Sequence, residues 1–486
     1  MHKRSVSLLV SGALAALASG CMLVGPDYER PPVQVPSDWR LPAGTAAELT
    51  NSPWWQQFGD PVLDRLITTA LENNRDLKLA AARVEQFQGQ LTATTGEQFP
   101  LLDAAGTAGR ERLSADQRLP GESATVGVNG LAAGVSFELD LWGKLRRATE
   151  SARAQLLSSE EARRTVVLTL VSGVATSYIS LRDFDARLAI ARNTLTSRAE
   201  SLRIAKLRFQ AGITSELDLR QAESEYESTQ AVIPQLEQAI AQQENALSVL
   251  LGRDPGPIER GRALGDLRAP AIPAGLPSDL LERRPDIRDA EQQLIAANAQ
   301  IGVARAAYFP TISLTGQVGT ASTQLGELFT GPARVWQYAL PISVPIFTFG
   351  RIEGSVAATE AVQRQALESY RKSIQTAFRE VDDGLIAARK TREQGEAQRR
   401  QTEALARYLK LARLRYDNGY TSYLEVVDAE RNLFNAQLSL AQTRGSELAA
   451  LIGLYKAMGG GWVVDATASA PAAQGLAGQA RPASAG

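Results

Sequence analysis

The chain of 486 residues carries 52 Lys and Arg against 53 Asp and Glu, with one histidine, His2, and one cysteine, Cys21. Balanced charge argues against a nucleic-acid-binding protein. If an N-terminal export signal is removed, no histidine remains for general base catalysis, and one cysteine cannot make a disulfide or a Cys/His zinc site. The composition therefore predicts neither an enzyme nor a metalloprotein. Aromatic residues are few while Ala, Gln, Glu, Arg and Leu abound, which favours long helices.

Residues 1–20 have the pattern of a secretory signal peptide. Lys3 and Arg4 precede an apolar run from Ser5 to Leu17, which is too short to span a membrane. The letters LASGC, ending at Cys21, resemble the bacterial lipobox, whose cysteine is lipidated and becomes the mature N-terminus. We therefore expect an N-acyl chain and an S-diacylglycerol lipid on Cys21, which anchor an extended segment over 21–60 to a membrane. An ordinary signal peptide with a chance cysteine is the alternative.

The remainder of the chain contains an internal duplication. The segment RFQAGITSELDLRQAESEYESTQ at 208–230 is repeated 207 residues later as RYDNGYTSYLEVVDAERNLFNAQ at 415–437. Phe-Pro pairs at 99–100 and 309–310 continue the correspondence upstream. These matches predict a first repeat over 61–252 and a second over 279–462, joined by a linker at 253–278. The tail at 463–486 is rich in Ala, Gly, Pro and Ser and is expected to be disordered.

Both repeats follow one plan, in which a helix leads into two strands, a very long helix and a second long helix. In the first repeat we expect strands at about 101–113 and 126–141 and helices at 145–208 and 215–251. In the second repeat we expect strands at about 311–320 and 336–347 and helices at 352–415 and 422–458. A helix of 64 residues would reach about 95 Å, so such helices must pack side by side along their length. The uncharged stretch 166–181 is predicted to be buried, because 16 residues are too few to cross a membrane.

The strand segments alternate apolar and polar residues, which places the two kinds on opposite faces of a sheet. Such a sheet either lies on a soluble core or forms a membrane barrel, with apolar residues toward lipid and polar residues toward a lumen. Pro341 and Pro345 favour an edge or rim position for the last strand. Four strands cannot close a barrel, and open edges are not tolerated in lipid. A membrane-spanning form therefore requires strands from several chains, and the sequence does not choose between a dimer and a trimer.

The turn between the two long helices has the same residues in each repeat. Gly212 and Gly419 suit the left-handed conformation that ends a helix. Ser215 and Ser422, each followed three residues later by an acidic residue, form predicted capping boxes that begin the next helix. The sequence thus predicts two helical hairpins.

At this point the sequence resembles the TolC-like outer-membrane efflux proteins, in their OprM/NodT lipoprotein branch. The resemblance covers residues 21 to about 462. Its motifs are the lipobox, GPDY at 25–28, WWxxFxDPxL at 54–63, ERRPDI at 282–287, AANAQIGVARAAYFPTISLTG at 296–316 and the two hairpin turns.

The resemblance implies a mainly α-helical fold with a transmembrane β part. Three chains would form a 12-stranded outer-membrane barrel and a periplasmic helical barrel, with loops 114–125 and 320–334 outside the cell. It further implies a passive exit duct for drugs and other toxic small molecules, without a cofactor. The implied partners are a periplasmic adaptor and an inner-membrane pump, commonly of the resistance-nodulation-division class.

By the same resemblance, the periplasmic end is closed by residues of the second hairpin. The family motif Tyr-Leu-x-x-x-Asp-Ala falls on 423–429, which assigns the constriction to Leu424 and Asp428, with Arg431 one turn beyond as an ion-pair partner of Asp428 or of another helix. Asp428 is replaced by Gln221 in the first repeat. The hairpin tips are the expected adaptor contacts, and they comprise Gly212, Thr214, Ser215, Leu217, Gly419, Thr421 and Ser422. For Asp428 and Arg431, an ordinary solvated helix charge is the alternative.

Two other functions are alternatives to the efflux duct. A duct for protein or peptide secretion would have the same architecture. A periplasmic adaptor or scaffolding lipoprotein would also contain a coiled-coil hairpin, but usually one hairpin flanked by β-rich modules. The duplication of the hairpin together with its strands favours the duct.

Overall fold

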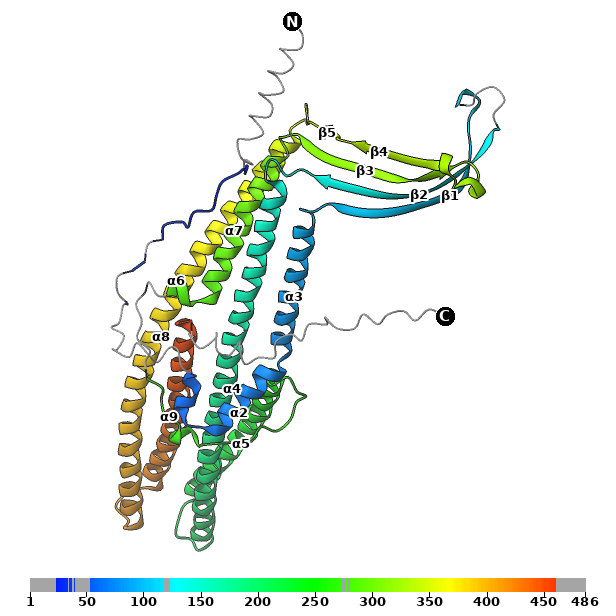
Figure 1. Cartoon of the computed structure of the whole chain (residues 1–486). Helices are drawn as coiled ribbons and strands as arrows, with labels where there is room; N and C mark the ends of the chain where they lie inside the picture. The colour runs from blue at the N-terminus through cyan, green and yellow to red at the C-terminus, as the bar shows by residue number, and fades with distance from the viewer. Residues whose placement is uncertain are drawn as a thin grey trace. The chain divides into compact units, whose positions relative to one another are not determined.

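The computed structural model describes residues 23–33, 35–36, 39, 53–117, 123–271, 277 and 280–459 (Figure 1). The predicted signal peptide, Cys21 and the tail at 463–486 lie outside the described residues, as does part of the linker. The chain forms two compact units. One contains 84–159 and 289–371, and the other contains 160–288 and 372–486, so each unit takes corresponding parts of both repeats.

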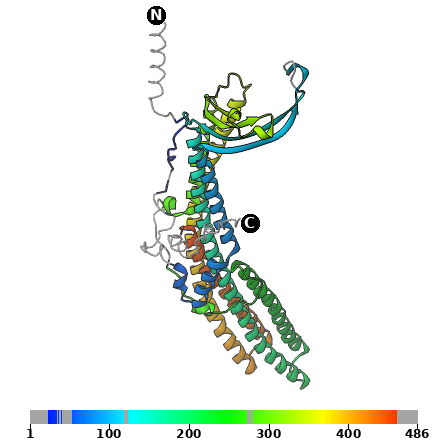
Figure 2. The same cartoon turned by 45° about the vertical axis from the view of Figure 1, so that its right-hand side comes forward.

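The first unit contains an antiparallel sheet in the order β1-β2-β3-β4 (Figure 2). Its strands are β1 (Leu101–Arg112), β2 (Thr125–Glu138), β3 (Thr311–Ser322), β4 (Arg334–Ala339) and the two-residue β5 (Ile342–Ser343), which pairs with β3. The join between the repeats is the pairing of β2 with β3. Strands β1 and β4 are the two edges.

The predicted strand over 336–347 is wrong as one continuous element. Its ladder is interrupted between β4 and β5, where Pro341 has no N–H to donate. The carbonyl of Pro341 still accepts a hydrogen bond from the Ser313 N–H at 3.1 Å, which holds the interrupted segment beside β3. The expected edge position of this strand is confirmed.

The sheet joins helices through short, well-packed corners. The helices that begin or lie partly in this unit are α3 (Arg75–Gly96), α4 (Lys144–Gln210), α7 (Pro285–Ala306) and α8 (Arg351–Asp417). Before α4, the Trp142 ring stacks on Phe309 with centroids 4.7 Å apart, and its N–H donates to the Pro310 carbonyl at 2.8 Å. Gly143 has φ 77°, which lets the chain turn from strand into helix.

The described part of the N-terminal segment is extended and is tied to these helices. The Tyr28 hydroxyl donates to Glu291 at 3.0 Å, and Arg30 pairs with the same carboxylate at 2.8 Å. Asp27 pairs with the nearly buried Arg147 at 2.6 Å. These bonds fix the GPDY motif and Arg30 against the helices of the first unit.

The second unit contains the short helices η2 (Trp54–Phe58), α2 (Pro61–Asn73) and α6 (Leu280–Arg283), and the long helices α5 (Glu216–Leu250) and α9 (Tyr423–Ala457). The apolar stretch of α4 is long and apolar enough to cross a membrane by composition. Its side chains nevertheless pack in the core of this unit, where Val171, Val174 and Leu181 are fully buried. The predicted burial of this stretch is therefore confirmed.

The WWxxFxDPxL motif supplies one side of that core. Trp54 stacks on Tyr455 of α9 with centroids 5.3 Å apart. The buried Asp60 caps α2 by accepting from the Val62 N–H at 2.9 Å, and it also accepts from the Tyr178 hydroxyl at 2.7 Å and the Arg262 N–H at 2.9 Å. This carboxylate is thereby satisfied by three donors, as a buried charge requires.

The ERRPDI motif contacts the C-terminal end of α9. Arg284 is almost fully buried, forms ion pairs with Asp286 at 2.6 Å and Glu380 at 2.8 Å, and donates to the Ala457 carbonyl at 3.0 Å. A guanidinium at this place satisfies one of the carbonyl groups that a helix leaves unpaired at its C-terminus.

Candidate gate and hairpin tips

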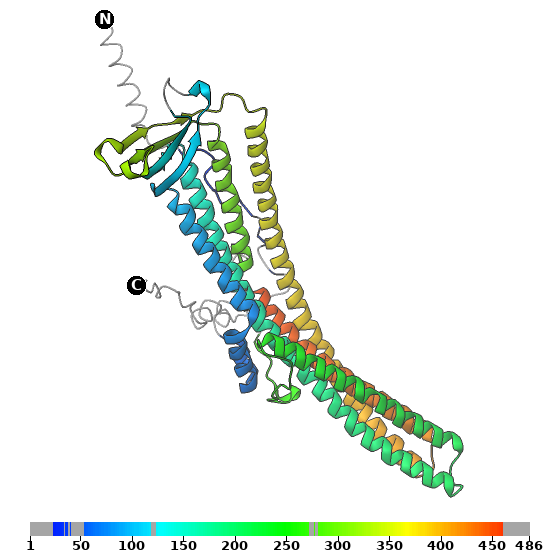
Figure 3. The same ribbon diagram turned by 90° about the vertical axis from the view of Figure 1, so that its right-hand side faces the viewer.

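The two helical hairpins, α4–α5 and α8–α9, lie side by side in the second unit (Figure 3). Both turns have the same backbone geometry. Gly212 has φ 71° and Gly419 has φ 78°, and the residue after each glycine donates back five residues, from Ile213 to Arg208 at 2.8 Å and from Tyr420 to Arg415 at 2.9 Å. This is the Schellman motif that ends a helix with a left-handed residue.

The caps that begin α5 and α9 differ from each other. The Ser215 side chain accepts from the Asp218 N–H at 3.3 Å, and Thr214 donates to the Asp218 carboxylate. The predicted capping box at Ser422 is wrong, because its side chain caps nothing in the described structure. The carboxylate of Glu425, which would complete that box, instead pairs with Arg415 at 3.0 Å and accepts from Thr421. Glu425 thus forms an ion pair with α8 instead of completing the cap at the start of α9.

The predicted gate residues lie on the free face of α9. Leu424 is 57% exposed, and Asp428 lies one turn further along the same face. The Asp428 carboxylate pairs with Arg431 at 2.7 Å and accepts from Asn432 at 3.0 Å. Arg431 was expected to pair either with Asp428 or with a residue of another helix, and in the structure it pairs with Asp428. The three predicted gate residues are thus brought together on one exposed stripe.

The opposite face of α9 is buried against the other three helices. Tyr423, Val426, Val427 and Ala429 pack with residues of α4, α5 and α8. Glu430 lies on this buried side and pairs with Arg413 of α8 at 2.5 Å. Burial, together with the negative charge of Glu430, raises the pKa of Tyr423 to about 12. The hydroxyl therefore stays neutral near pH 7.

Two arginines, Arg208 and Arg198, link the two hairpins, and a third, Arg413, links the helices of the second hairpin. Arg413 joins α8 to α9 through its pair with Glu430. Arg208, at the end of α4, lies over the Tyr416 ring of α8 at 5.2 Å and is 4.0 Å from Asp417. Arg198 is buried between α4, α5 and α9, where it pairs with Glu225 at 2.7 Å and lies 5.3 Å from the Phe434 ring. Burial lowers the pKa of the Arg198 guanidinium.

Sequence reasoning did not identify Arg198, Arg208 or Arg413 as functional. Each lies within a predicted helix that is rich in arginine, and its partners lie up to 236 residues away. The period of apolar residues indicates which face is buried, but it does not indicate which charged residue enters that face.

The hairpin tips expose large apolar side chains. Ile213 and Leu217 at the first tip are 74% and 65% exposed, and Tyr420 at the second is 78% exposed. Further along the same helices some apolar residues are buried, such as Leu202 and Val426, while Leu411 and Leu414 are also exposed. Exposed apolar residues grouped at a turn make each tip a candidate contact site.

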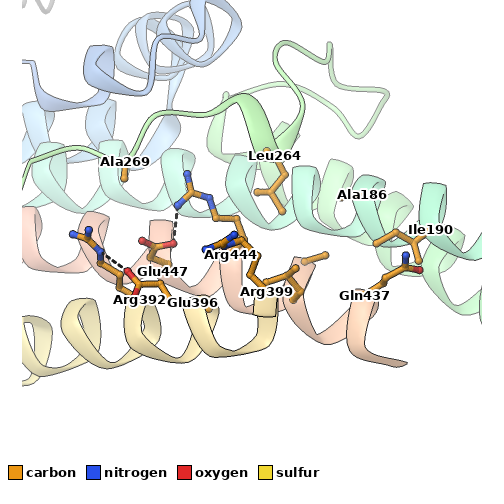
Figure 4. A pocket seen from close by; sticks show the side chains of 14 residues that line it. Ala186, Ile190, Leu264, Ala269, Arg392, Glu396, Arg399, Gln437, Arg444 and Glu447 are labelled. Carbon is orange, nitrogen blue, oxygen red and sulfur yellow. Dashed lines mark hydrogen bonds and ion pairs between the residues drawn. The ribbon is translucent and has the colours of Figure 1, made fainter. Parts of the chain in front are cut away.

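A cavity of about 790 Å³ lies further along α9, between α4, α8 and the Leu264–Ala269 segment (Figure 4). Its charged side chains are already paired, Arg444 with Glu447 at 2.7 Å and Arg392 with Glu396 at 3.4 Å. Arg444 also donates to the Leu267 carbonyl at 2.9 Å. With its charges satisfied internally, the cavity is a weaker candidate than the tips. Among the described residues there is no cluster of acidic, histidine or cysteine side chains able to hold a metal ion.

The duplicated fold described above matches a known protein family. Residues 66–253 and 276–460 match the family described as "Outer membrane efflux protein". The chain belongs to this family. The two matched ranges correspond to the two repeats, and the chain is accordingly the outer-membrane channel component of an efflux system.

Individual relatives match over nearly their full length. The toluene efflux pump outer membrane protein TtgC of Pseudomonas putida is 40% identical over 466 residues, which cover 94% of this chain and 96% of the relative. The probable outer membrane lipoprotein SilC of Salmonella typhimurium is 38% identical, covering 94% and 99%. A crystal structure of CusC, whose description refers to transmembrane channel formation, superposes with a TM-score of 0.81 at 36% identity, covering 90% and 99%.

Proposed function

We propose that three copies of this chain form one duct, in which each contributes four strands to a 12-stranded barrel and two hairpins to a helical tube. The observation that carries this proposal is the sheet, whose edge strands β1 and β4 each pair on one side only within the described residues. Open edges are not tolerated in lipid, so the barrel must be closed by other copies. Twelve strands are enough to leave a water-filled lumen.

We further propose that Leu424 and Asp428 form the closed periplasmic gate. In a threefold assembly, one Leu424 and one Asp428 from each copy would surround the axis. A ring of carboxylates attracts cations and repels anions, while a ring of leucines narrows the pore. The pairing of Asp428 with Arg431 supports this assignment, because it fixes the carboxylate on the exposed face of α9.

The proposed partners are a periplasmic adaptor, which contacts the tips at 212–217 and 419–424, and an inner-membrane pump of the resistance-nodulation-division class. The exposed apolar residues of both tips support this docking site. Adaptor binding would open the gate by favouring a state in which the second hairpin has moved outward. The name of TtgC supports toxic small organic molecules as the exported compounds.

We also propose that Cys21 carries the lipid anchor. The name of SilC as a lipoprotein supports this, as does the extended path of residues 23–32 along the first unit. The mass of the intact purified chain is the direct measurement, since lipid on Cys21 adds a mass that a Cys21→Ser variant would lose.

The gate is tested by replacing Asp428 with alanine and measuring single-channel conductance in planar bilayers. The variant removes the carboxylate ring and releases Arg431, so we expect a severalfold higher conductance and lower selectivity for cations. Gln221→Ala is the matched control, because Gln221 occupies the corresponding position of the first repeat. Equal conductance of the Asp428→Ala variant and the unmodified channel would reject the gate assignment.

A further inference from the structure

The two faces of the sheet differ in chemistry over their whole width. Directly paired residues of antiparallel strands point to the same face, so the register defines each face. Val135 pairs with Gly316, Phe137 with Leu314, and Val318 with Trp336. The apolar face of β1 to β4 includes Leu102, Ala104, Leu131, Ala133, Val135, Phe137, Ile312, Leu314, Val318, Trp336 and Tyr338. The other face carries mostly polar and small residues such as Thr315 and Gln317, with Leu101 and three valines as its larger apolar residues. The apolar face is therefore the one suited to lipid.

The apolar face ends in arginine on both edge strands. On β1 the alternate residues that follow Ala108 are Arg110 and Arg112, and on β4 the residue before Trp336 in the same series is Arg334. Each lies at the end of its own strand that is away from the helices. The pairings across the sheet make Arg334 level with Gly106 of β1, so Arg110 and Arg112 lie further out along the strands. All three are exposed. The one acidic residue at this end of β1, Glu111, points to the opposite face.

These arginines have no carboxylate partner among the residues that the structure describes. None of the ion pairs within that part of the chain includes Arg110, Arg112 or Arg334. This is unusual for the molecule, in which most arginines of the helices are paired. A charged side chain on the lipid side of a barrel is tolerated near the membrane surface and is costly at its midplane. Each guanidinium group therefore belongs near a membrane surface rather than at the midplane.

The strands of a closed barrel are staggered, and a stagger of about four to six residues between copies brings the arginines of both edges together. Because β1 and β4 are the two edges of each chain, the proposed assembly pairs β1 of one copy with β4 of the next. Arg334 then lies at the same end and on the same face as the neighbouring copy's equivalents of Arg110 and Arg112. Each of the three seams would carry a group of three unpaired guanidinium groups on the lipid side.

We propose that each group binds the phosphates of a phosphorylated glycolipid, of the lipid A type, in the outer leaflet. Guanidinium groups recognise phosphate through paired N–H donors, and basic side chains beside an apolar surface attract anionic lipids. The adjacent apolar face, with Trp336 two residues from Arg334, would receive the acyl chains. Three cations around one seam favour a lipid with two phosphates over a lipid with one. This inference rests on the proposed trimer.

The test is native mass spectrometry of the full-length protein in detergent, titrated with lipid A that carries two phosphates or with its monophosphoryl form. We expect the unmodified trimer to bind the bisphosphorylated lipid more tightly. In the triple variant Arg110→Gln, Arg112→Gln, Arg334→Gln, affinity should fall about 100-fold, since each basic residue near an anionic lipid contributes a factor of about five. The preference between the two lipids should be lost at the same time.

Two further variants complete the design. The triple change to lysine keeps the charge but not the paired donors, so it should fold as the unmodified chain does and bind with intermediate affinity. Arg371→Gln, Arg379→Gln, Arg392→Gln removes three exposed arginines of α8 and should bind normally. Unchanged binding by an intact glutamine triple variant would overturn the lipid site, and unchanged binding by the lysine variant would overturn the role of the paired guanidinium donors. An unmodified protein that is not trimeric in the same spectra would instead contradict the proposed function.

Discussion

At the scale of single residues, the buried Arg198 side chain contacts both hairpins. It is 3% exposed, donates to the Glu225 carbonyl at 2.7 Å, pairs with the Glu225 carboxylate and lies over Phe434. It therefore links α5 and α9 through one guanidinium on α4. Because Phe434 follows Asp428 by less than two helical turns, this contact lies close to the proposed gate.

Arg198→Gln tests this role. Glu225 would keep its charge without a partner in a largely buried place, and breaking such a pair costs about 3–5 kcal/mol. We expect a clearly lower melting temperature in detergent, measured by circular dichroism. Arg203→Gln removes an exposed arginine that pairs with Glu200 on the same helix, and exposed pairs contribute little. If both variants melted together with the unmodified protein, Arg198 would not hold the hairpins.

At the scale of elements, the tip turns depend on their glycines. In Gly419→Ala, a φ of 78° must be adopted by a residue with a side chain, at a cost of about 1–2 kcal/mol. Gly395→Ala is the matched control, because Gly395 is inside α8 and an added Cβ would meet only Thr443 at an ordinary 3.7 Å. Alanine is favoured over glycine inside a helix by about 1 kcal/mol. We expect the first change to lower and the second to raise the unfolding temperature; two shifts of the same sign would contradict this reading of the turn.

Elements were predictable from sequence where the signal is local. The alternating strands, the proline-free helices α4 and α8 and the glycine turns can each be recognised from residues that are close together in the sequence. The sequence did not reveal the absent cap at Ser422, because Glu425 is engaged by Arg415 of another helix. It also did not reveal where the last strand breaks, since proline at 341 indicates an edge but not the position of the interruption. For the gate, the family motif was enough to predict which residues of α9 would form the constriction. The buried arginines could not be predicted, because their roles depend on contacts between distant segments.

At the scale of the whole molecule, the sheet of one chain is incomplete. Its strands carry a face suited to lipid, yet β1 and β4 each leave one row of backbone groups unpaired. In lipid these groups have no water to bind. Pairing between copies satisfies them, and it also places the β1 edge of one chain beside the β4 edge of another. The sheet therefore needs the strands of other copies in order to be stable in the membrane.

Disulfide cross-linking tests this pairing directly, because Cys21 is the only native cysteine. Ala105→Cys on β1 and Gln337→Cys on β4 lie on the polar face. Within one chain β2 and β3 separate them, by roughly 14 Å at about 4.8 Å per strand, which is too far for a disulfide. Oxidation of the double variant in membranes should therefore link copies and give covalent dimers and trimers in a denaturing gel.

The control is Ala105→Cys with Ala132→Cys, since these residues are direct partners in β1 and β2. Their disulfide should form within one chain and leave a monomer. The register between copies is tested by moving the β1 cysteine to Asp103 or Thr107, which lie on the same face. A ladder that stops at the trimer for at least one register supports three copies, and a fourth band would indicate a larger ring. If every register gave only monomers while the control pair was oxidised, the edges would not meet and the closed barrel would have to be abandoned.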